Sequence, residues 1–456
     1  MLRIATVFTA LLVGLAPLIL GGNRPLLWAF NALGAGIALI LTGVALATRH
    51  GRRVDLSLDL LAPSILGWFL LLLWMLFQLI PWDSGALGHP VWGLAAGALD
   101  ERLPGRISVD PTATKLAVLR HLILGSLFLS VYCLSRQRED AALFLGILVG
   151  FFCFYAAYGL VRVSFQVDRI WWFPVRDAAS VTGTFIGRNT AATYFGLGVV
   201  AVTALVTRSL TRALRIDWTG ADRRDAFVNT LIRSTGGLAV IWILLFTALL
   251  LTASRGGIIA SLGAIAVLVF LLTIRGQNKS RPLLKILIIG SLVLGVIAML
   301  EIAGGKLLSR FFISGVKDVD RYHAMQTALT AAFDHLWTGT GAGTFQSIFP
   351  LYRPASLDHT GFWSSSHSDY LDALVALGAP GFGVLMFILL HLTYVSLKGL
   401  LQRHRDSHFP LIALSATVLV GLHGFVDFSL QIQGVAITYV GLLAIGVAQS
   451  HGSLRG

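Results

Sequence analysis

The sequence is short of charge and of cysteine, and each shortage excludes a class of protein. Asp, Glu, Lys and Arg make up 12% of the 456 residues, whereas a soluble globular domain carries about 25%, so too few polar groups are available to cover a water-exposed surface. The two cysteines, Cys133 and Cys153, lie inside apolar runs and indicate neither a disulfide framework nor a metal cluster. The sequence also lacks the HExxH spacing of a zinc site and the GxSxG elbow of a serine hydrolase.

What the chain has in abundance is apolar sequence. Hydrophobic residues make up 56% of it, and the mean hydropathy is +0.78. Twelve runs approach the roughly 20 residues needed to cross a bilayer; they are 4–22, 26–47, 60–80, 114–134, 141–163, 190–207, 237–253, 257–274, 285–303, 373–397, 410–426 and 433–449. The sequence therefore predicts an all-α, polytopic integral membrane protein of about 12 transmembrane helices. The run 4–22 is interpreted as a retained helix and not as a signal peptide.

The net charge of +13 would suggest nucleic acid in a soluble protein, but here the Lys and Arg residues gather in alternate loops. These loops are 49–53, 136–138, 208–233, 275–285 and 398–405. Because Lys and Arg mark cytoplasmic loops, we predict that this side and both termini are cytoplasmic. No nucleic-acid partner is expected.

The opposite side carries the long polar segments 81–113, 164–189 and 304–372. We interpret the chain as one membrane domain in three parts. An N-terminal transmembrane bundle of about nine helices (1–303) is followed by a large outer loop (304–372) and by C-terminal transmembrane helices (373–456). Loops on a rigid scaffold commonly carry binding and catalysis, so we expect the functional site on this outer side.

Two arginines interrupt apolar sequence at the expected outer ends of helices. Arg255 lies between two apolar runs, with Gly256 and Gly257 beside it, and a charge inside a span costs about 2.5–3.5 kcal/mol unless it faces a cavity or an interface. Arg188 stands at the start of a helix, with Asn189 placed to cap it, and helix N-termini attract anions. Each arginine suits phosphate binding, and each also suits the simpler role of contacting lipid headgroups.

A third arginine, Arg321, precedes a segment with helical periodicity. The spacing predicts a helix from about Arg321 to Phe333, capped by Asp318 or Asp320. Arg321 then lies in the first turn, where the helix dipole disfavours a cation, so its position indicates either an anionic ligand or a salt bridge to Asp318. Three glycines follow within 339–343, but no strand or βαβ unit surrounds them, and a nucleotide-binding loop is not indicated.

His367 lies in "SSSHSDYLDALVALGAPG" (364–381), where a polar run becomes an apolar helix. Ser366 followed by Asp369 resembles a capping box, which puts His367 in the first helical turn. The positive end of the helix dipole disfavours an imidazolium there, so we expect a neutral ring that can accept a proton as a general base. The simpler alternative is an interfacial histidine that bonds to the loop backbone.

The segment "LVGLHGFVDFSLQIQG" (419–434) contains His423 and Asp427, four residues apart. On one face of a helix the two side chains would lie close enough to hydrogen-bond. A carboxylate at the end of a span needs a partner. Asp427 is therefore expected either to neutralise an arginine and orient a site or to form a structural pair with His423.

Taken in order, six motifs resemble those of a known family. They are "PLILGGNRPLLWA" (17–29), "TGTFIGRNTAATY" (182–194), "TASRGG" (252–257), "DRYHAMQTALTAAFDHLWTGTGAGTFQSIFP" (320–350), "HSDYLDALVALGAPG" (367–381) and "HGFVDF" (423–428). The ordered set, with its long outer loop before the histidine segment, spans nearly the whole chain. It resembles the O-antigen ligase and O-antigen polymerase superfamily of bacterial polytopic membrane glycosyltransferases.

The resemblance implies a GT-C-like fold in the bacterial inner membrane, with short helices in the large periplasmic loop and a periplasmic active site. It implies a glycan donor carried on undecaprenyl diphosphate and an inverting transfer without nucleotide sugar, metal or cofactor. By motif position, it implies that Arg188, Arg255 and Arg321 bind the diphosphate and that His367 activates the acceptor hydroxyl. His423 and Asp427 would have supporting roles.

Several functions are compatible with these residues. A ligase would transfer the glycan to lipid A–core, a polymerase to another lipid-linked glycan, and a protein O-oligosaccharyltransferase to Ser or Thr. From another class, a transporter of polysaccharide or lipid would place charged residues at mid-membrane and use discontinuous helices. The enzyme requires instead that Arg188, Arg255, Arg321 and His367 converge on one outer cavity.

Overall fold

A computed structural model describes residues 1–48, 56–82, 87–175, 178–213, 223–274, 290, 315–355, 363–403 and 406–451 of the chain. The helices that follow the predicted apolar segments are α1 (Leu2–Leu15), α2 (Pro25–Ala47), α3 (Leu58–Phe77), α5 (Pro111–Leu134), α6 (Arg138–Ser164), α7 (Arg188–Ala213), α8 (Arg223–Leu251), α9 (Arg255–Ile274), α13 (Asp369–Gln402), α14 (His408–His423) and α15 (Gln433–Ala448). The remaining elements are α4 (Val91–Leu99), α11 (Gly315–Asp334), α12 (Phe345–Tyr352), the 3-10 turns η1 (Leu20–Gly22) and η2 (Ser429–Gln431), and the strands β1 (Arg169–Ile170) and β2 (Phe173–Pro174).

The all-α membrane fold predicted from the sequence is confirmed. Eleven of the twelve apolar runs lie on helices, and the twelfth, 285–303, lies outside the described residues except for residue 290. In the described part of the chain, seven helices are long and apolar enough to cross a membrane, namely α2, α3, α5, α6, α7, α9 and α13. Shorter apolar helices are α1, residues 235–251 of α8, α14 and α15.

The first apolar run is less regular than predicted. The helix expected over 4–22 ends at Leu15, and the chain then turns through η1, where Gly21 and Gly22 have φ angles of 70° and 73°. Pro17 follows the helix end, and proline cannot donate the hydrogen bond that would continue a helix. The break brings this segment to the start of α15, because a side chain at Gly22 would lie 3.4 Å from the backbone nitrogen of Gly434.

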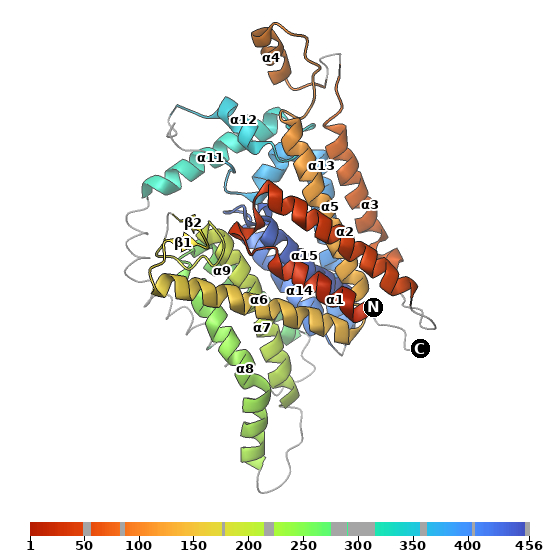
Figure 1. Cartoon of the computed structure of the whole chain (residues 1–456), viewed down its shortest axis with the longest axis vertical. Helices are drawn as coiled ribbons and strands as arrows, with labels where there is room; N and C mark the ends of the chain where they lie inside the picture. The colour runs from red at the N-terminus through yellow and green to blue at the C-terminus, as the bar shows by residue number, and fades with distance from the viewer. Residues whose placement is uncertain are drawn as a thin grey trace.

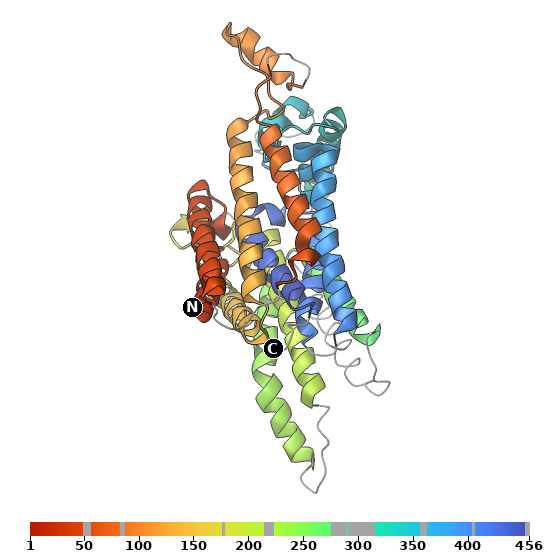
Figure 2. The same cartoon turned by 90° about the vertical axis from the view of Figure 1, so that its right-hand side faces the viewer.

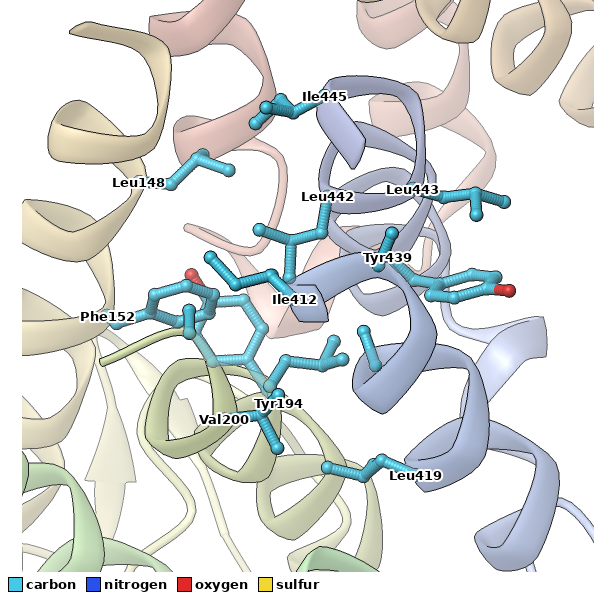
Figure 3. Close-up of a cluster of buried hydrophobic side chains, with 14 of the residues drawn as sticks. Leu148, Phe152, Tyr194, Val200, Ile412, Leu419, Tyr439, Leu442, Leu443 and Ile445 are labelled. Atoms are coloured by element: carbon cyan, nitrogen blue, oxygen red, sulfur yellow. The ribbon is translucent and has the colours of Figure 1, made fainter. Parts of the chain in front are cut away.

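The core forms around α15, in which every residue except the half-buried Val440 is buried. A helix that is apolar all round is typically buried among other helices. Figure 3 shows Leu442 of α15 beside Ile412 of α14, and Ile445 of α15 near Leu148 of α6. Helices at the periphery differ, since α2 and α3 expose large apolar side chains such as Leu26, Phe30 and Leu73, which suits contact with lipid.

The predicted outer segments carry structure of their own. Residues of 304–372 form α11 and α12, which lie across one end of the bundle, and α4 from 81–113 projects beyond them (Figures 1 and 2). Segment 164–189 contains the β1–β2 hairpin, in which Ile170 pairs with Phe173. The helix α11 is 20 residues long, longer than the short helices expected in this loop.

A buried glutamine fastens the predicted outer loop to two membrane helices. Gln78, directly after α3, is 0% exposed. Its Nε2 donates to the carbonyl oxygens of Thr338 and Ala376, each at 2.9 Å, and its Oε1 accepts from the backbone nitrogen of Ala342 at 3.1 Å. A buried amide that satisfies both its donor and acceptor ends fixes its surroundings tightly. The glycines within 339–343 therefore serve this packing.

One glycine at this junction permits the break inside α13. Gly378 has φ 65° and ψ 176°, a conformation open essentially to glycine alone. A Cβ atom there would lie 2.7 Å from the nitrogen of Gly339 and 2.9 Å from the carbonyl oxygen of Leu336. The residue thus lets the α13 backbone meet the loop that carries Gly339.

We expect Gly378→Ala to destabilise the protein by about 1–3 kcal/mol from backbone strain alone, with the close contacts adding to the loss. Thermal unfolding of the detergent-solubilised protein measures it. Gly383→Ala is the matched control, since that position on the same helix has open space around it and alanine is the better helix former there. Equal melting temperatures for the Gly378→Ala variant and the unmodified protein would contradict the packing described.

Candidate active site

Three helices begin at one place, where a fourth ends. The starts of α7 and α9 are joined by a hydrogen bond of 2.8 Å from the Ser254 hydroxyl to Oδ1 of Asn189. Asn189 also donates to Oδ1 of Asp427, which follows α14, at 3.1 Å. The nitrogen of Asp369, the first residue of α13, lies 2.9 Å from the carbonyl oxygen of Gly424. Helix N-termini carry partial positive charge, so their meeting point favours an anion.

Arg188 and Arg255 are the first residues of α7 and α9, each next to one member of the Asn189–Ser254 hydrogen bond. Asn189 was predicted to cap α7, and this is wrong: the helix starts at Arg188, and the Asn189 side chain bonds instead to Ser254 and Asp427. Ser254 caps α9 by accepting from the nitrogen of Gly257 at 3.3 Å. The two apolar runs that flank Arg255 in the sequence are separate helices joined by a short turn, because α8 ends at Leu251 and α9 begins at Arg255.

Arg321 lies further along its helix than predicted. The helix α11 begins at Gly315, so Arg321 is in its second turn, and the argument from the dipole of the first turn fails. Asp318 and Asp320 are inside the helix and cannot be its N-cap. The half-buried Arg321 faces the site, since its positive charge acts on both His367 and His423.

His367 precedes α13 and is not in its first turn, so that prediction is also wrong. The N-cap is Ser368, whose hydroxyl accepts from the nitrogen of Leu371 at 3.4 Å. The His367 backbone has a φ of 62°, in the left-handed region that is rare for a residue with a side chain. Its ring stands edge-on between Trp363 and Phe428, with centroid distances of 5.9 and 5.2 Å.

The charge state of His367 follows from this environment. Burial lowers the pKa of His367 to about 4, the nearby positive charge of Arg321 lowers it as well, and Asp427 raises it. The ring is therefore neutral at neutral pH, as expected, although the cause is burial and Arg321 and not the α13 dipole. In the part of the chain that the structure describes, buried Nδ1 has no hydrogen-bond partner.

His423 and Asp427 do not share a helix face, contrary to the prediction. The helix α14 ends at His423, and Asp427 lies in the loop beyond it. The two are connected through hydroxyl groups: Nδ1 of His423 is 2.6 Å from Oγ1 of Thr193, which is 2.8 Å from Oγ of Ser429. Ser429 in turn donates to Oδ2 of Asp427. Asp427 therefore has two donors, Ser429 and Asn189.

Behind the site lies a polar group that the sequence did not reveal. Arg120 of α5 donates to the carbonyl oxygen of Gln431, and its guanidinium lies 4.8 Å from the centroid of the Trp28 ring. Gln431 donates to Asp372 at 2.5 Å, and Arg120 interacts electrostatically with Asp369. These contacts join α5 and η2 to the first turn of α13, directly after His367.

A sequence signal was available for only one of the missed residues, Thr193. Thr193 lies four residues after Asn189 inside a buried helix, and polar side chains in membrane segments generally face a partner. Ser429 and Ser254 carry no such pattern, because their partners lie far away in sequence.

Among the described residues, no three His, Cys, Asp or Glu side chains are grouped so that they could hold a metal ion.

The four predicted residues Arg188, Arg255, Arg321 and His367 all come to this end of the bundle. Comparison with known families gives a match over residues 239–386 to the family described as O-antigen ligase. No curated protein matches the chain. The matched segment contains Arg255, Arg321 and His367, and within it the resemblance to the O-antigen ligase and polymerase superfamily is confirmed.

Proposed function

We propose that this chain, whose residues 239–386 are similar to O-antigen ligase, is a glycosyltransferase that uses a glycan on undecaprenyl diphosphate as donor. The observation that carries the proposal is that the cation Arg321 lies close enough to the buried, neutral His367 to lower its pKa, at the place where α7, α9 and α13 begin. This arrangement suits a reaction in which a base, His367, accepts a proton while Arg321 and the helix N-termini stabilise an anionic leaving group.

The reaction would break the bond between C1 of the donor sugar and the diphosphate oxygen while an acceptor hydroxyl forms a new bond to C1 from the opposite face. Negative charge grows on the diphosphate as that bond breaks. Arg188, Arg255 and Arg321, with the three helix N-termini, would stabilise this charge as it develops. Fixed cations at a water-poor membrane boundary do this more effectively than water.

His367 would take the proton of the acceptor hydroxyl. Because Nδ1 is buried, Nε2 is the nitrogen that a substrate could reach. The low pKa keeps the ring unprotonated and able to accept, and the rings of Trp363 and Phe428 hold it in place. Inversion at C1 follows from attack opposite the leaving group, and no metal is needed in this scheme.

The proposed setting is the bacterial inner membrane, with cytoplasmic termini and the site on the periplasmic face. The acceptor would be lipid A–core for a ligase, a second lipid-linked glycan for a polymerase, or a protein hydroxyl for an O-oligosaccharyltransferase. The lipid tail of the donor requires a site open to the bilayer, which peripheral helices with exposed apolar faces can border.

Loss of the gene followed by analysis of three glycan pools tests the proposal. We expect long-chain glycan to disappear from lipopolysaccharide, from exopolysaccharide or from glycoproteins, while lipid-linked glycan accumulates. The pool that is lost identifies the acceptor. If all three pools and the lipid-linked precursor are unchanged, the proposed transfer is wrong.

Arg321→Gln is expected to shift the acid limb of the pH profile. In the unmodified protein, kcat/KM for the acceptor, measured at saturating donor, should hold from pH 7 to about pH 5 and fall tenfold per unit below about pH 4, because His367 becomes protonated. Arg321 lowers the pKa of His367, so removing its charge raises that pKa, and the fall should begin about one unit higher. Arg102→Gln, an exposed change, should leave the limb in place. If the acid limb does not shift in Arg321→Gln, the charge of Arg321 does not lower the pKa of His367.

A further inference from the structure

A chain of hydroxyl groups links a carboxylate to the second histidine of the site. It runs from Asp427 through Ser429 and Thr193 to Nδ1 of His423, with Ser429 and Thr193 2.8 Å apart and Thr193 and His423 2.6 Å apart. The four residues come from α7, the end of α14, the following loop and η2. All four are buried.

The carboxylate decides the direction of every hydrogen bond in this chain. An ionised Asp427 can only accept, so the single proton of the Ser429 hydroxyl is used on it. Ser429 can then only accept from Thr193, which uses the single proton of that hydroxyl. Thr193 must therefore accept from His423, so the ring carries its proton on Nδ1, and Nε2 keeps a free lone pair. The longer contact of Thr193 with the Asn189 carbonyl oxygen, 3.3 Å, would use the same proton and leads to the same result.

The bare Nε2 lies against the start of α9. A Cβ atom on Gly256 would be 3.2 Å from Nε2 of His423, and one on Gly257 would be 3.4 Å from its Cε1. A side chain at Gly256 would therefore press on the ring, which lies close to the backbone beside Arg255. In the described part of the chain, Nε2 makes no hydrogen bond. A second series of hydrogen bonds links the Asp427 carboxylate, through Asn189 and Ser254, to the backbone nitrogen of Gly257. It holds the same part of the α9 backbone in place.

We propose that Thr193 and Ser429 are positioning residues, which hold His423 with its free nitrogen toward the diphosphate so that the ring takes up one proton when the donor binds. The inference rests on the proposed function, because it requires a diphosphate at the start of α9. The proton comes from solvent and bonds to Nε2. The imidazolium then donates to a phosphate oxygen, and Asp427 stabilises its charge through the two hydroxyls.

The surrounding charges favour this change on binding. The groups around the His423 ring are Arg321 from α11 and Asp427 from the loop after α14, Arg255 at the start of α9, and Asp369 at the start of α13. Without a bound anion, the positive charges of Arg321 and Arg255 disfavour protonation of His423. A bound diphosphate adds two negative charges and reverses that balance, and hydrogen bonds between charged groups are the strong ones.

Calorimetry with a soluble diphosphate diester tests the inference. The probe is a P1,P2-di(short-chain alkyl) diphosphate, whose two charges do not titrate near neutral pH. Binding enthalpies at pH 7.5 are measured in buffers of different ionisation enthalpy, and the slope gives the number of protons taken up. We expect about one proton for the unmodified protein and for Thr193→Ser, which keeps the hydroxyl. Thr193→Val should take up close to none and bind roughly tenfold more weakly.

Ser429→Ala breaks the same chain at another point and should reproduce the Thr193→Val result, which keeps the test valid if one variant does not fold. Thr207→Val is the matched control, because Thr207 is buried on the same helix and donates to its own helix at Ala204; it should take up one proton. Binding of the probe without proton uptake by the unmodified protein overturns the inference alone, as does full uptake by Thr193→Val. Absence of any binding by the unmodified protein would instead count against the proposed function and the inference together.

Discussion

Replacing His367 with alanine is expected to lower the rate of glycan transfer by about 10²–10⁴-fold, the usual contribution of a general base. The acceptor hydroxyl would then have to lose its proton to water at a place where burial keeps water scarce. The variant should still accumulate in the membrane, because His367 lies in the loop before α13 and is not part of a membrane helix. Transfer by purified protein in liposomes, with initial rates at saturating donor, measures the effect.

His323→Ala is the matched control for that experiment. His323 belongs to α11 in the same 304–372 segment, its ring stands edge-on to Tyr322, and it has no role in the proposed chemistry. Its variant should transfer glycan at close to the normal rate. If purified His367→Ala retains normal transfer, His367 has no part in the mechanism, whatever its charge state.

Arg255→Lys is expected to reduce transfer by at least about tenfold although the positive charge is kept. A guanidinium presents two parallel N–H donors to a phosphate, whereas an ammonium is a single point of charge. The loss should fall on kcat more than on KM if the second hydrogen bond strengthens as the leaving group becomes charged. Rates over a range of donor concentrations separate the two parameters.

The comparison for Arg255 is Arg102→Lys, a change of the same kind on an exposed residue, which should have no effect. Melting temperature should be measured in parallel, because Arg255 opens α9 beside the buried Ser254 cap. A normal rate for Arg255→Lys in a stable protein would mean that Arg255 does not bind the diphosphate through two parallel hydrogen bonds.

The membrane architecture could be read from the sequence because the bilayer imposes it. Only a helix satisfies its own backbone in lipid, so apolar runs such as those of α3 and α9 could be placed to within a few residues. Runs were misplaced where backbone chemistry intervened. Pro17 and the glycines after it end α1 early, and no hydropathy pattern carries that information.

The site was predicted less completely, for reasons that can be stated residue by residue. Ser366 and Ser368 both suit an N-cap, and the sequence alone favoured the wrong one, which moved His367 into the helix. The spacing of His423 and Asp427 suggested a direct pair, but Gly424 is where α14 stops. Their real connection through Thr193 and Ser429 depends on the packing of α7 against α14 and η2, which single-sequence spacing does not encode.

The burial of α15 has a consequence for how the protein is made. Of the described helices it is the last to be synthesised, yet it lies at the centre of the core. The helices made earlier therefore cannot complete their packing until α15 is present. At 16 residues it is about 24 Å long, short of the roughly 30 Å hydrocarbon layer, and makes a weak independent anchor. We therefore expect its neighbours to hold it in the membrane, so that the packed core forms only after α15 has been synthesised.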